Sequence, residues 1–262
     1  MFDFHSDTDT YFRMQHRTSE EYIIPFIKEV YAIPAGARVM EFGCGEAGVL
    51  SAFLKIGSTA IGIDIDERKL DYGRQNMADK IESGELQLIN QDIYRINPEK
   101  NLGGKFDLII LKDVIEHISN QQKLMTHLKT FLKPKGLIFL GFPPWQMPFG
   151  GHQQMCRNRF LARLPYFHLL PMPVYRAILK ASGDEGDLCA IKECGISIER
   201  FERIAKQAGF ETVNCRFYWI NPIYKYKFNL KTRKTPAWIA KIPYLRNFVT
   251  TSVYYLLQTK NE

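Results

Sequence analysis

VMEFGCGEAG, residues 39–48, joins a short apolar segment to three glycines spaced G-x-G-x-x-G. Glycines at this spacing let the backbone turn tightly between a strand and a helix and approach a nucleotide closely. An acidic residue, Glu41, lies two positions before the first glycine. The stretch therefore predicts a nucleotide-binding turn. Several classes of cofactor are bound by such a turn, and the rest of the chain has to separate them.

Strand and helix patterns alternate along the chain on both sides of this turn. Apolar runs with strand character occupy residues 37–43, 59–66, 85–92, 106–113, 137–143, 210–220 and 251–260. Helical spacing of apolar residues occupies residues 19–31, 48–57, 67–81, 120–132 and 198–209. The residues expected to cap helix starts are Thr18 with Glu21, Ser119 with Gln122, and Ser197. The alternation predicts an α/β, Rossmann-like, doubly wound and mostly parallel sheet with helices on both faces, in a single domain over residues 1–262.

Two segments are too long to be ordinary connections. Residues 142–196 follow the fifth predicted strand, and residues 220–250 follow the sixth. Loops of this length within a compact domain are usually functional lids or small subdomains. In open α/β sheets the ligand lies beyond the carboxyl ends of the strands, and both segments leave from such ends. We therefore expect both to hang over the ligand crevice as lid insertions.

Acidic residues after the second and third predicted strands narrow the choice of cofactor. Asp64 ends the second strand and is placed to accept both hydroxyls of a ribose, which would also suit NAD. Asp92 ends the third strand, where a carboxylate suits an exocyclic adenine amine. Glu41 disfavours a pyrophosphate on the glycine turn, because a carboxylate repels phosphate. A cofactor with a cationic amino-acid tail fits Glu41 better, so an NAD dehydrogenase is the less favoured alternative.

Four segments together resemble the class I S-adenosylmethionine-dependent methyltransferases: Glu41-x-Gly43-x-Gly45-x-x-Gly48, GIDID at 62–66, QDI at 91–93 and DVIEHI at 113–118. The resemblance covers residues 18–141 with specific motifs and the later parts by arrangement only. It implies a seven-stranded sheet with an antiparallel last strand, S-adenosylmethionine as cofactor and S-adenosylhomocysteine as product. The chain departs mildly from the family at Ala47, where many members have glycine.

The resemblance also implies roles for residues at the carboxyl ends of the strands. The glycine turn would pass under the amino-acid part of the cofactor, with Glu41 tied to the cofactor ammonium indirectly or through water. Asp64 would hold the ribose hydroxyls, Asp92 the adenine amine, and the Ile93 backbone an adenine nitrogen. The residues after the fourth strand would line the methionine end through their backbones. The full set of predicted cofactor-binding residues is Glu41, Gly43, Cys44, Gly45, Gly48, Asp64, Ile65, Asp92, Ile93, Lys112 and Asp113.

The methyl acceptor has to be sought in the two long segments. The cofactor already carries a strong electrophile, so no catalytic side chain is obligatory. His152, in the first segment, is the best candidate for a general base because a histidine titrates near neutrality. The alternative interpretation is a histidine hydrogen-bonded within a loop. His117, in DVIEHI, is expected to be structural. His152 and Cys156 would offer only two metal ligands, so we predict no metal site.

The positive charge of the chain is concentrated near its C-terminal end. The net charge is +7, but Thr212–Glu262 hold nine Lys or Arg and one acidic residue, so the preceding residues are close to neutral. Residues 220–250 interleave these cations with Tyr, Phe and Trp. The pattern suits a membrane-surface or lipid-linked substrate, a nucleic acid, or a solvated basic face over aromatic packing. Nucleic acid is the minority alternative, because no RNA- or DNA-binding module is visible.

The remaining features indicate a cytoplasmic protein with free thiols. The five cysteines form no C-x-x-C pair, the start MFDFHSDTDT is unlike a signal peptide, and apolar runs are shorter than a membrane span. The predicted function is S-adenosylmethionine-dependent methyl transfer to a small or medium-sized metabolite, preferably at oxygen. The alternatives are an RNA methyltransferase and a non-catalytic S-adenosylmethionine-binding interaction protein. The sequence leaves the oligomeric state open.

Overall fold

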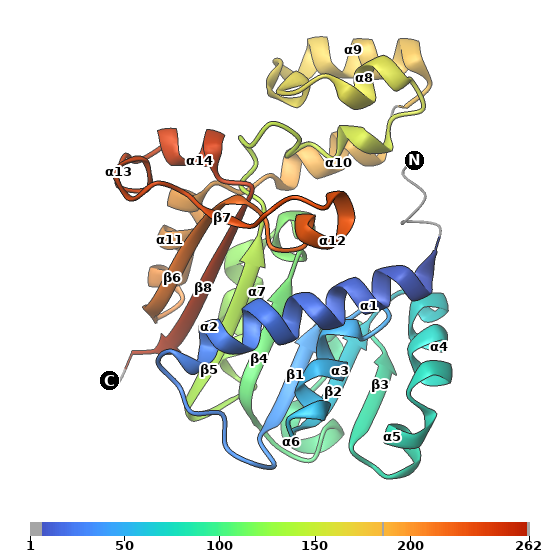
Figure 1. Ribbon diagram of the computed structural model, residues 1–262, viewed down its shortest axis with the longest axis vertical. Helices are drawn as coiled ribbons and strands as arrows, with labels where there is room; N and C mark the ends of the chain where they lie inside the picture. The colour runs from blue at the N-terminus through green and yellow to red at the C-terminus, as the bar shows by residue number, and fades with distance from the viewer. Residues whose placement is uncertain (1–6, 185, 261–262) are drawn as a thin grey trace.

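The computed structural model describes residues 7–184 and 186–260, which form one twisted sheet with helices on both faces (Figure 1). Residues 1–6, part of the start that is unlike a signal peptide, lie outside the described residues. The strands are β1 (Arg38–Phe42), β2 (Thr59–Asp64), β3 (Leu86–Asn90), β4 (Phe106–Lys112), β5 (Leu132–Phe142), β6 (Phe210–Ile220), β7 (Arg233–Lys234) and β8 (Ser252–Thr259). Among the described residues, no helix is long and apolar enough to cross a membrane.

The helices that flank the sheet follow the predicted alternation with the strands. Before and between the first four strands lie α1 (Thr8–Thr18), the π-helical turn η2 (Ser19–Ile23), α2 (Ile24–Lys28), α3 (Gly48–Lys55), α4 (Glu67–Asn76), α5 (Ala78–Glu82), η3 (Ile93–Arg95) and α6 (Pro98–Asn101). After β4 come η4 (Ile115–His117), α7 (Gln121–Lys129), η5 (Gln153–Met155), α8 (Arg159–Arg163), η6 (Phe167–Leu169), α9 (Met172–Ser182), α10 (Asp187–Cys194), α11 (Ile198–Gln207), α12 (Tyr224–Phe228), α13 (Ala237–Ala240) and α14 (Leu245–Val249).

The strand order is β3-β2-β1-β4-β5-β8-β6-β7. Parallel pairing runs from β3 through β2, β1 and β4 to β5, whereas β8 is antiparallel to both β5 and β6. This confirms the predicted mostly parallel, Rossmann-like sheet with an antiparallel last strand. The described sheet has one strand more than predicted, because the two-residue β7 pairs with the end of β6. Two residues carry no periodicity, so the sequence could not reveal this strand.

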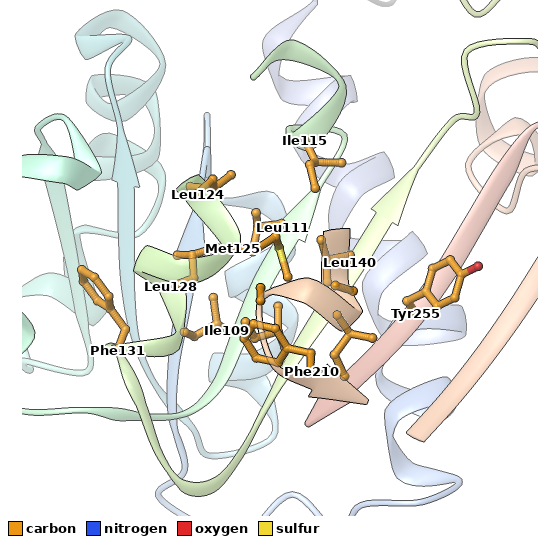
Figure 2. Packing of buried hydrophobic residues seen from close by; sticks show 14 of the residues in the cluster. Ile109, Leu111, Ile115, Leu124, Met125, Leu128, Phe131, Leu140, Phe210 and Tyr255 are labelled. Carbon is orange, nitrogen blue, oxygen red and sulfur yellow. The ribbon is translucent and has the colours of Figure 1, made fainter. Parts of the chain in front are cut away.

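The central strands are buried on both faces. Ile109 and Leu111 of β4 pack in one apolar cluster with α7 and α11, as Figure 2 shows for part of that cluster. Leu108 and Ile110 point the opposite way, into a second cluster with α2, α3 and α4. All four side chains are at most 1% exposed. Burial on both sides is why these strands appear in the sequence as continuous apolar runs.

The first helix begins earlier than predicted. α1 starts at Thr8, and the carboxylate of Asp7 caps it by accepting a hydrogen bond from the Thr10 backbone N–H at 3.1 Å. The predicted start at Thr18 is wrong: Thr18 is buried between α1 and the π-helical turn, and its hydroxyl donates to the Met14 carbonyl. The pattern S/T-x-x-E can occur within a helix as well as at its start, and here the polar composition of α1 hid the true beginning.

Of the two other predicted helix starts, one is confirmed and one is displaced by a single residue. Ser197 caps α11, since its hydroxyl accepts from the Arg200 backbone N–H at 3.1 Å, as predicted. The cap of α7 is Asn120 rather than Ser119, a shift of one residue, and it accepts from the Lys123 backbone N–H. The predicted free thiols are also confirmed, because all five cysteines are unpaired.

The first long segment contains three helices, α8, α9 and α10. These helices surround a small apolar cluster of their own, made of Cys156, Leu161, Phe167, Tyr175, Leu179, Leu188 and Cys189. In Figure 1 the segment stands beyond the carboxyl ends of β4 and β5. Its helices are short and interrupted by proline and glycine, so helical periodicity is weak in the sequence.

Candidate active site

The glycine turn between β1 and α3 needs unusual backbone angles. Gly43 has a φ of +72°, and a Cβ there would lie 2.5 Å from Val114 Cγ2. Gly45, with a φ of +52°, donates its backbone N–H to Asp64 Oδ2 at 2.7 Å. Ala47 also has a positive φ, +62°, a backbone conformation that favours glycine. An alanine in this left-handed conformation costs about 1–2 kcal/mol, so the turn carries some strain.

Gly48 is required for a different reason, the close approach of α1. A Cβ on Gly48 would lie 2.7 Å from the Phe12 carbonyl oxygen and 2.7 Å from Gln15 Cβ. His16 Nδ1 also lies 2.6 Å from Ser51 Oγ, which ties α1 to α3 a turn further on. The first helix is therefore held directly across the start of α3. It forms one wall beside the glycine turn (Figure 1).

Asp64, at the end of β2, holds the glycine turn in place. Its carboxylate accepts hydrogen bonds from Gly45 N–H at 2.7 Å and from Asp66 N–H at 2.9 Å. Asp66 accepts in turn from Arg68 N–H and so caps α4. The neighbouring Ile65 is apolar yet 78% exposed, so it offers an apolar surface beside the turn.

Asp92 and Ile93 follow the end of β3. The carboxylate of Asp92 accepts from the Tyr94 backbone N–H at 3.0 Å and starts η3, while Asp92 itself is exposed. Ile93 is buried, and its carbonyl oxygen lies 2.9 Å from His127 Nε2. The exposed carboxylate and the fixed backbone are thus placed at the same edge as the glycine turn.

Charged side chains are buried where β1 and β4 end. Glu41 is 2% exposed, and its Oε2 has no hydrogen-bond partner among the described residues. Burial raises the pKa of Glu41 well above its ordinary value. Lys112 is also buried, and its ammonium lies 2.5 Å from an oxygen of Asp113. Asp113 has a positive φ of +56°, which turns the chain sharply at the end of β4.

His152 meets DVIEHI beyond β4. The rings of His152 and His117 have centroids 4.9 Å apart. Glu116 is 5% exposed, and neither of its carboxylate oxygens has a partner among the described residues. Ligand atoms of Glu116, His117 and His152 all lie within 4.8 Å of one another, so the three could hold a metal ion. The sequence did not point to this group, and Cys156 lies in the separate cluster of the first insertion.

The imidazole of His152 is neutral at physiological pH. Burial, and then the neighbouring His117, lower the pKa of His152 to about 4, while the charge of Asp113 acts in the opposite direction. His152 has a left-handed backbone, with φ +53°, and its N–H donates to the Phe149 carbonyl at 3.2 Å. A neutral ring held in this way is able to accept a proton.

Three further residues reach the same place from the two ends of the chain, and sequence reasoning missed them. The charge of Asp113 perturbs Tyr11 of α1 and also Tyr224 and Lys227 of α12. The Lys227 ammonium lies 5.1 Å from the centre of the Tyr11 ring. Burial, followed by repulsion from Lys112, lowers the pKa of Lys227 to about 8. These elements are distant in sequence, and only the alternating Tyr and Lys of α12 hinted at a shared site.

Ion pairs and ring contacts join α12 to the first helices. Lys225 Nζ lies 2.5 Å from Glu21 Oε2, and the Arg17 guanidinium lies 4.6 Å from the centre of the Tyr226 ring. The Arg17 guanidinium also lies 3.5 Å from Glu21 Oε1. Exposed Arg13 pairs with Asp9 within α1.

The sequence profile of a family described as a methyltransferase domain matches residues 14–214. The chain belongs to this family. Two curated relatives are named ubiquinone biosynthesis O-methyltransferase. The one from Thiobacillus denitrificans is 26% identical over 105 residues, and the one from Dechloromonas aromatica is 30% identical over 110 residues. Each match covers 40% of this chain and 44% of the relative. The chain therefore matches less than half the length of these relatives.

Solved structures agree in fold with this methyltransferase-domain protein. Magnesium protoporphyrin IX methyltransferase from Synechocystis PCC 6803, solved with bound S-adenosylhomocysteine, has a TM-score of 0.54 and 15% identity, covering 94% of this chain and 84% of that one. A methyltransferase from Aquifex aeolicus has a TM-score of 0.53 and 12% identity, covering 93% of both chains. The resemblance found in the sequence is thus confirmed, and S-adenosylmethionine is the cofactor of the family.

The residues of this methyltransferase domain fit that cofactor. The buried Glu41 oxygen without a partner suits a cationic ammonium, which would stabilise the charged carboxylate that burial disfavours. The φ values of Gly43 and Gly45 keep side chains out of the space beside the turn. The acid at the end of β2 and the exposed acid after β3 lie at the same edge of the sheet as the glycine turn.

Proposed function

We propose that this protein transfers a methyl group to an oxygen atom of a small or medium-sized molecule. The cofactor would lie along the predicted set of binding residues: the glycine turn beneath its amino-acid part, Glu41 toward its ammonium, Asp64 on the ribose, and Asp92 with the Ile93 backbone at the adenine. When bound, S-adenosylmethionine supplies an electrophilic methyl group and becomes S-adenosylhomocysteine. The residues of the chain would then have to orient the acceptor and exclude water.

The observation that carries this proposal is the contact of the His152 ring with the His117 ring, which places a buried imidazole beyond the end of β4. As a hydroxyl oxygen forms its bond to the methyl carbon, its proton has to leave, and His152 would accept it. Protonation of a ring whose pKa is lowered is unfavourable in itself. The carboxylate of Asp113 offsets this, because its charge raises the pKa of His152. We assign His152 the role of general base, with His117 packed against it as a positioning residue.

The two insertions, residues 142–196 and 220–250, would act as lids over this site. Support comes from their origin at the carboxyl ends of β5 and β6 and from the side chains they contribute, His152 from the first and Tyr224 with Lys227 from the second. We place the reaction in the cytoplasm. The curated relatives are named for O-methylation in ubiquinone biosynthesis, which supports oxygen as the acceptor atom.

A nucleic acid acceptor has less support. Of the basic residues in the second insertion, Lys225 is paired with Glu21, and Arg246 is paired with Glu199 and Glu202. These two cations therefore hold the fold together and are less available to phosphates than the exposed cations of the segment, Lys231, Arg233, Lys234 and Lys241. An RNA methyltransferase would instead show retention on RNA that falls steeply with salt.

The test is transfer of labelled methyl groups from S-adenosylmethionine to fractions of a small-molecule extract. We expect label in a discrete fraction with the native protein and little with His152→Ala, while both proteins bind S-adenosylhomocysteine equally. Label in RNA would instead establish the RNA methyltransferase alternative. Tight cofactor binding with no labelled fraction of any kind would indicate the non-catalytic binding protein.

A further inference from the structure

The segment that carries α13 and α14 exposes apolar side chains and buries polar ones, the reverse of an ordinary pair of surface helices. Trp238 is 68% exposed, Tyr244 is 71% exposed and Leu245 is 47% exposed. Ile242 and Phe248 are also exposed. A surface helix normally buries its apolar side chains and exposes its polar ones. Here most of the large apolar side chains face away from the protein.

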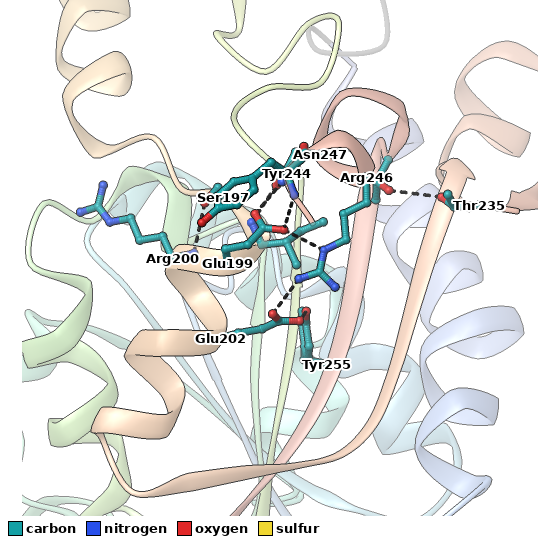
Figure 3. Close-up of polar contacts among 11 residues, drawn as sticks. Ser197, Glu199, Arg200, Glu202, Thr235, Tyr244, Arg246, Asn247 and Tyr255 are labelled. Atoms are coloured by element: carbon teal, nitrogen blue, oxygen red, sulfur yellow. Dashed lines mark hydrogen bonds and ion pairs between the residues drawn. The ribbon is translucent and has the colours of Figure 1, made fainter. Parts of the chain in front are cut away.

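The polar side chains of the same segment point inward and anchor it to α11 (Figure 3). Asn247 is 1% exposed, and its Oδ1 accepts from the Ile198 backbone N–H at 2.8 Å. The Glu199 carboxylate accepts from Tyr244 N–H at 2.9 Å, from Arg246 Nε at 2.8 Å and from Asn247 Nδ2 at 2.6 Å. The outward position of the apolar side chains is therefore fixed by buried hydrogen bonds and is not the result of a loose loop.

This apolar surface continues into the first insertion. The rings of Tyr166 and Phe248 have centroids 6.3 Å apart, and the Tyr166 hydroxyl donates to the Phe248 carbonyl at 3.4 Å. Tyr166 is itself 41% exposed, and its N–H donates to the Pro148 carbonyl in the loop that leads to His152. We call the exposed side chains of this surface the apolar platform: Tyr166, Trp238, Ile242, Tyr244, Leu245 and Phe248.

The charges around the apolar platform are all of one sign within its own segment. Residues 221–249 contain seven Lys or Arg and no Asp or Glu. Four of these cations are exposed: Lys231, Arg233, Lys234 and Lys241. Lys241 lies between Trp238 and Tyr244 in the chain, directly after α13. Because Lys241 is exposed within the platform's own stretch of chain and residues 221–249 contain no acidic residue, this segment is complementary to a surface that is apolar inside and anionic at its rim.

We propose that the apolar platform binds the surface of an anionic lipid bilayer. Trp and Tyr are the aromatic residues that favour the level of the lipid headgroups, and neighbouring lysines can extend their ammonium groups to lipid phosphates. α13 and α14 have four and five residues, so they would lie on the membrane without crossing it. The six side chains of the apolar platform carry no charge, so they suit the apolar interior of a bilayer better than the phosphates of a nucleic acid.

Membrane binding would bring the acceptor site close to the lipid. Tyr166 belongs to the same insertion as His152, so docking through the apolar platform would orient the lids toward the bilayer. This consequence rests on the proposed function and would favour an acceptor that is lipophilic or attached to a lipid. Docking itself depends only on the apolar platform and its cations, so it can be measured without any acceptor.

The test is sedimentation of the full chain with vesicles of phosphatidylcholine alone or of phosphatidylcholine mixed with phosphatidylglycerol. We expect retention on the mixed vesicles and a blue shift of tryptophan emission that is lost in Trp238→Phe. The double variant Trp238→Ser/Tyr244→Ser should bind these vesicles at least about tenfold more weakly than the native protein does, because two large side chains no longer leave water on binding. Val30→Ser, at an exposed apolar residue remote from α13 and α14 in the sequence, should bind as the native protein does.

Several results would overturn the proposal. These are no retention on anionic vesicles, equal retention of the double variant and the native protein, or an unshifted Trp238 emission. A concentration-dependent dimer that only the double variant abolishes would assign the apolar platform to a second copy of the chain instead. Binding of S-adenosylhomocysteine by the double variant checks that it is folded. Methyl transfer to a soluble acceptor without vesicle binding would refute docking while leaving the proposed function intact.

Discussion

Replacing Asp64 by alanine should weaken cofactor binding through two separate losses. In the structure the Asp64 carboxylate accepts the backbone N–H groups of Gly45 and Asp66 at 2.7 and 2.9 Å. The same carboxylate is the residue that we propose for the ribose hydroxyls. Asp64→Ala therefore removes the support of the glycine turn and a direct contact with the ligand at once.

The size of the effect follows from the hydrogen bonds involved. A hydrogen bond to a charged group contributes about 1.5–3 kcal/mol. Asp64 is only partly buried, so each bond should fall near the lower end of this range. Loss of the ribose contact alone then predicts a reduction in affinity of about tenfold, since 1.4 kcal/mol corresponds to a factor of ten. Distortion of the turn adds to this, and we expect a total reduction of about tenfold to a hundredfold.

Calorimetry with S-adenosylhomocysteine measures this change, and Asp66→Ala is the matched control. Asp66 lies two residues away and caps α4, so its loss should cost about 1 kcal/mol of stability and leave affinity unchanged. An analogue without the ribose 2′-hydroxyl separates the two contributions. The native protein should bind this analogue more weakly than it binds S-adenosylhomocysteine. Asp64→Ala should bind the two ligands equally well, because the partner of that hydroxyl is already gone. Equal affinities of Asp64→Ala and the native protein would refute the reasoning.

Four further predictions test other parts of the site. His152→Ala should abolish most turnover with unchanged cofactor affinity, measured by methyl transfer and calorimetry; full activity would make His152 a scaffold residue. Glu41→Gln should lower cofactor affinity about tenfold while the melting temperature of the free protein stays the same or rises, because a buried carboxyl without a partner is removed. Burial lowers the pKa of fully buried His168 to about 4. The free energy of unfolding should therefore be constant above pH 6.5 and fall by up to about 3 kcal/mol toward pH 4. In melting curves, the stability of His168→Asn should fall less steeply over this range. If His152 acts as a base, EDTA should leave turnover unchanged; inhibition by EDTA that zinc or manganese reverses would instead assign Glu116, His117 and His152 to a metal.

The sheet could be predicted because its burial leaves a strong pattern in the sequence. β4 is enclosed on both faces, so it is apolar throughout, and the structure starts and ends this strand within one residue of the prediction. The 11 residues of β6 match the predicted alternating run completely. Elements that make few apolar contacts were harder to predict from the sequence. α1 buries only Thr18 fully, so neither its start nor its length has an apolar signature.

The candidate site divides in the same way. The residues that we propose for the cofactor side follow strand ends or belong to one short turn, so local sequence is enough to propose them: Glu41, Asp64 and Asp92 are examples. Residues of the acceptor side come together only through tertiary packing. His117 meets His152 because the first insertion folds back over β4, and Lys227 reaches Tyr11 because α12 packs on α1. No spacing in the sequence encodes these two contacts.

Asp113 connects the two sides, and its position explains why the lids should respond to the cofactor. It follows β4 with a left-handed backbone and pairs with buried Lys112 on the cofactor side. On the other side its charge raises the pKa of His152 and of Lys227. A cationic cofactor beside Asp113 would offset this charge, and the pKa of both groups should then fall further. His152 is already neutral and would stay so, whereas Lys227, with a pKa of about 8, would shift further toward its neutral amine when the cofactor is bound.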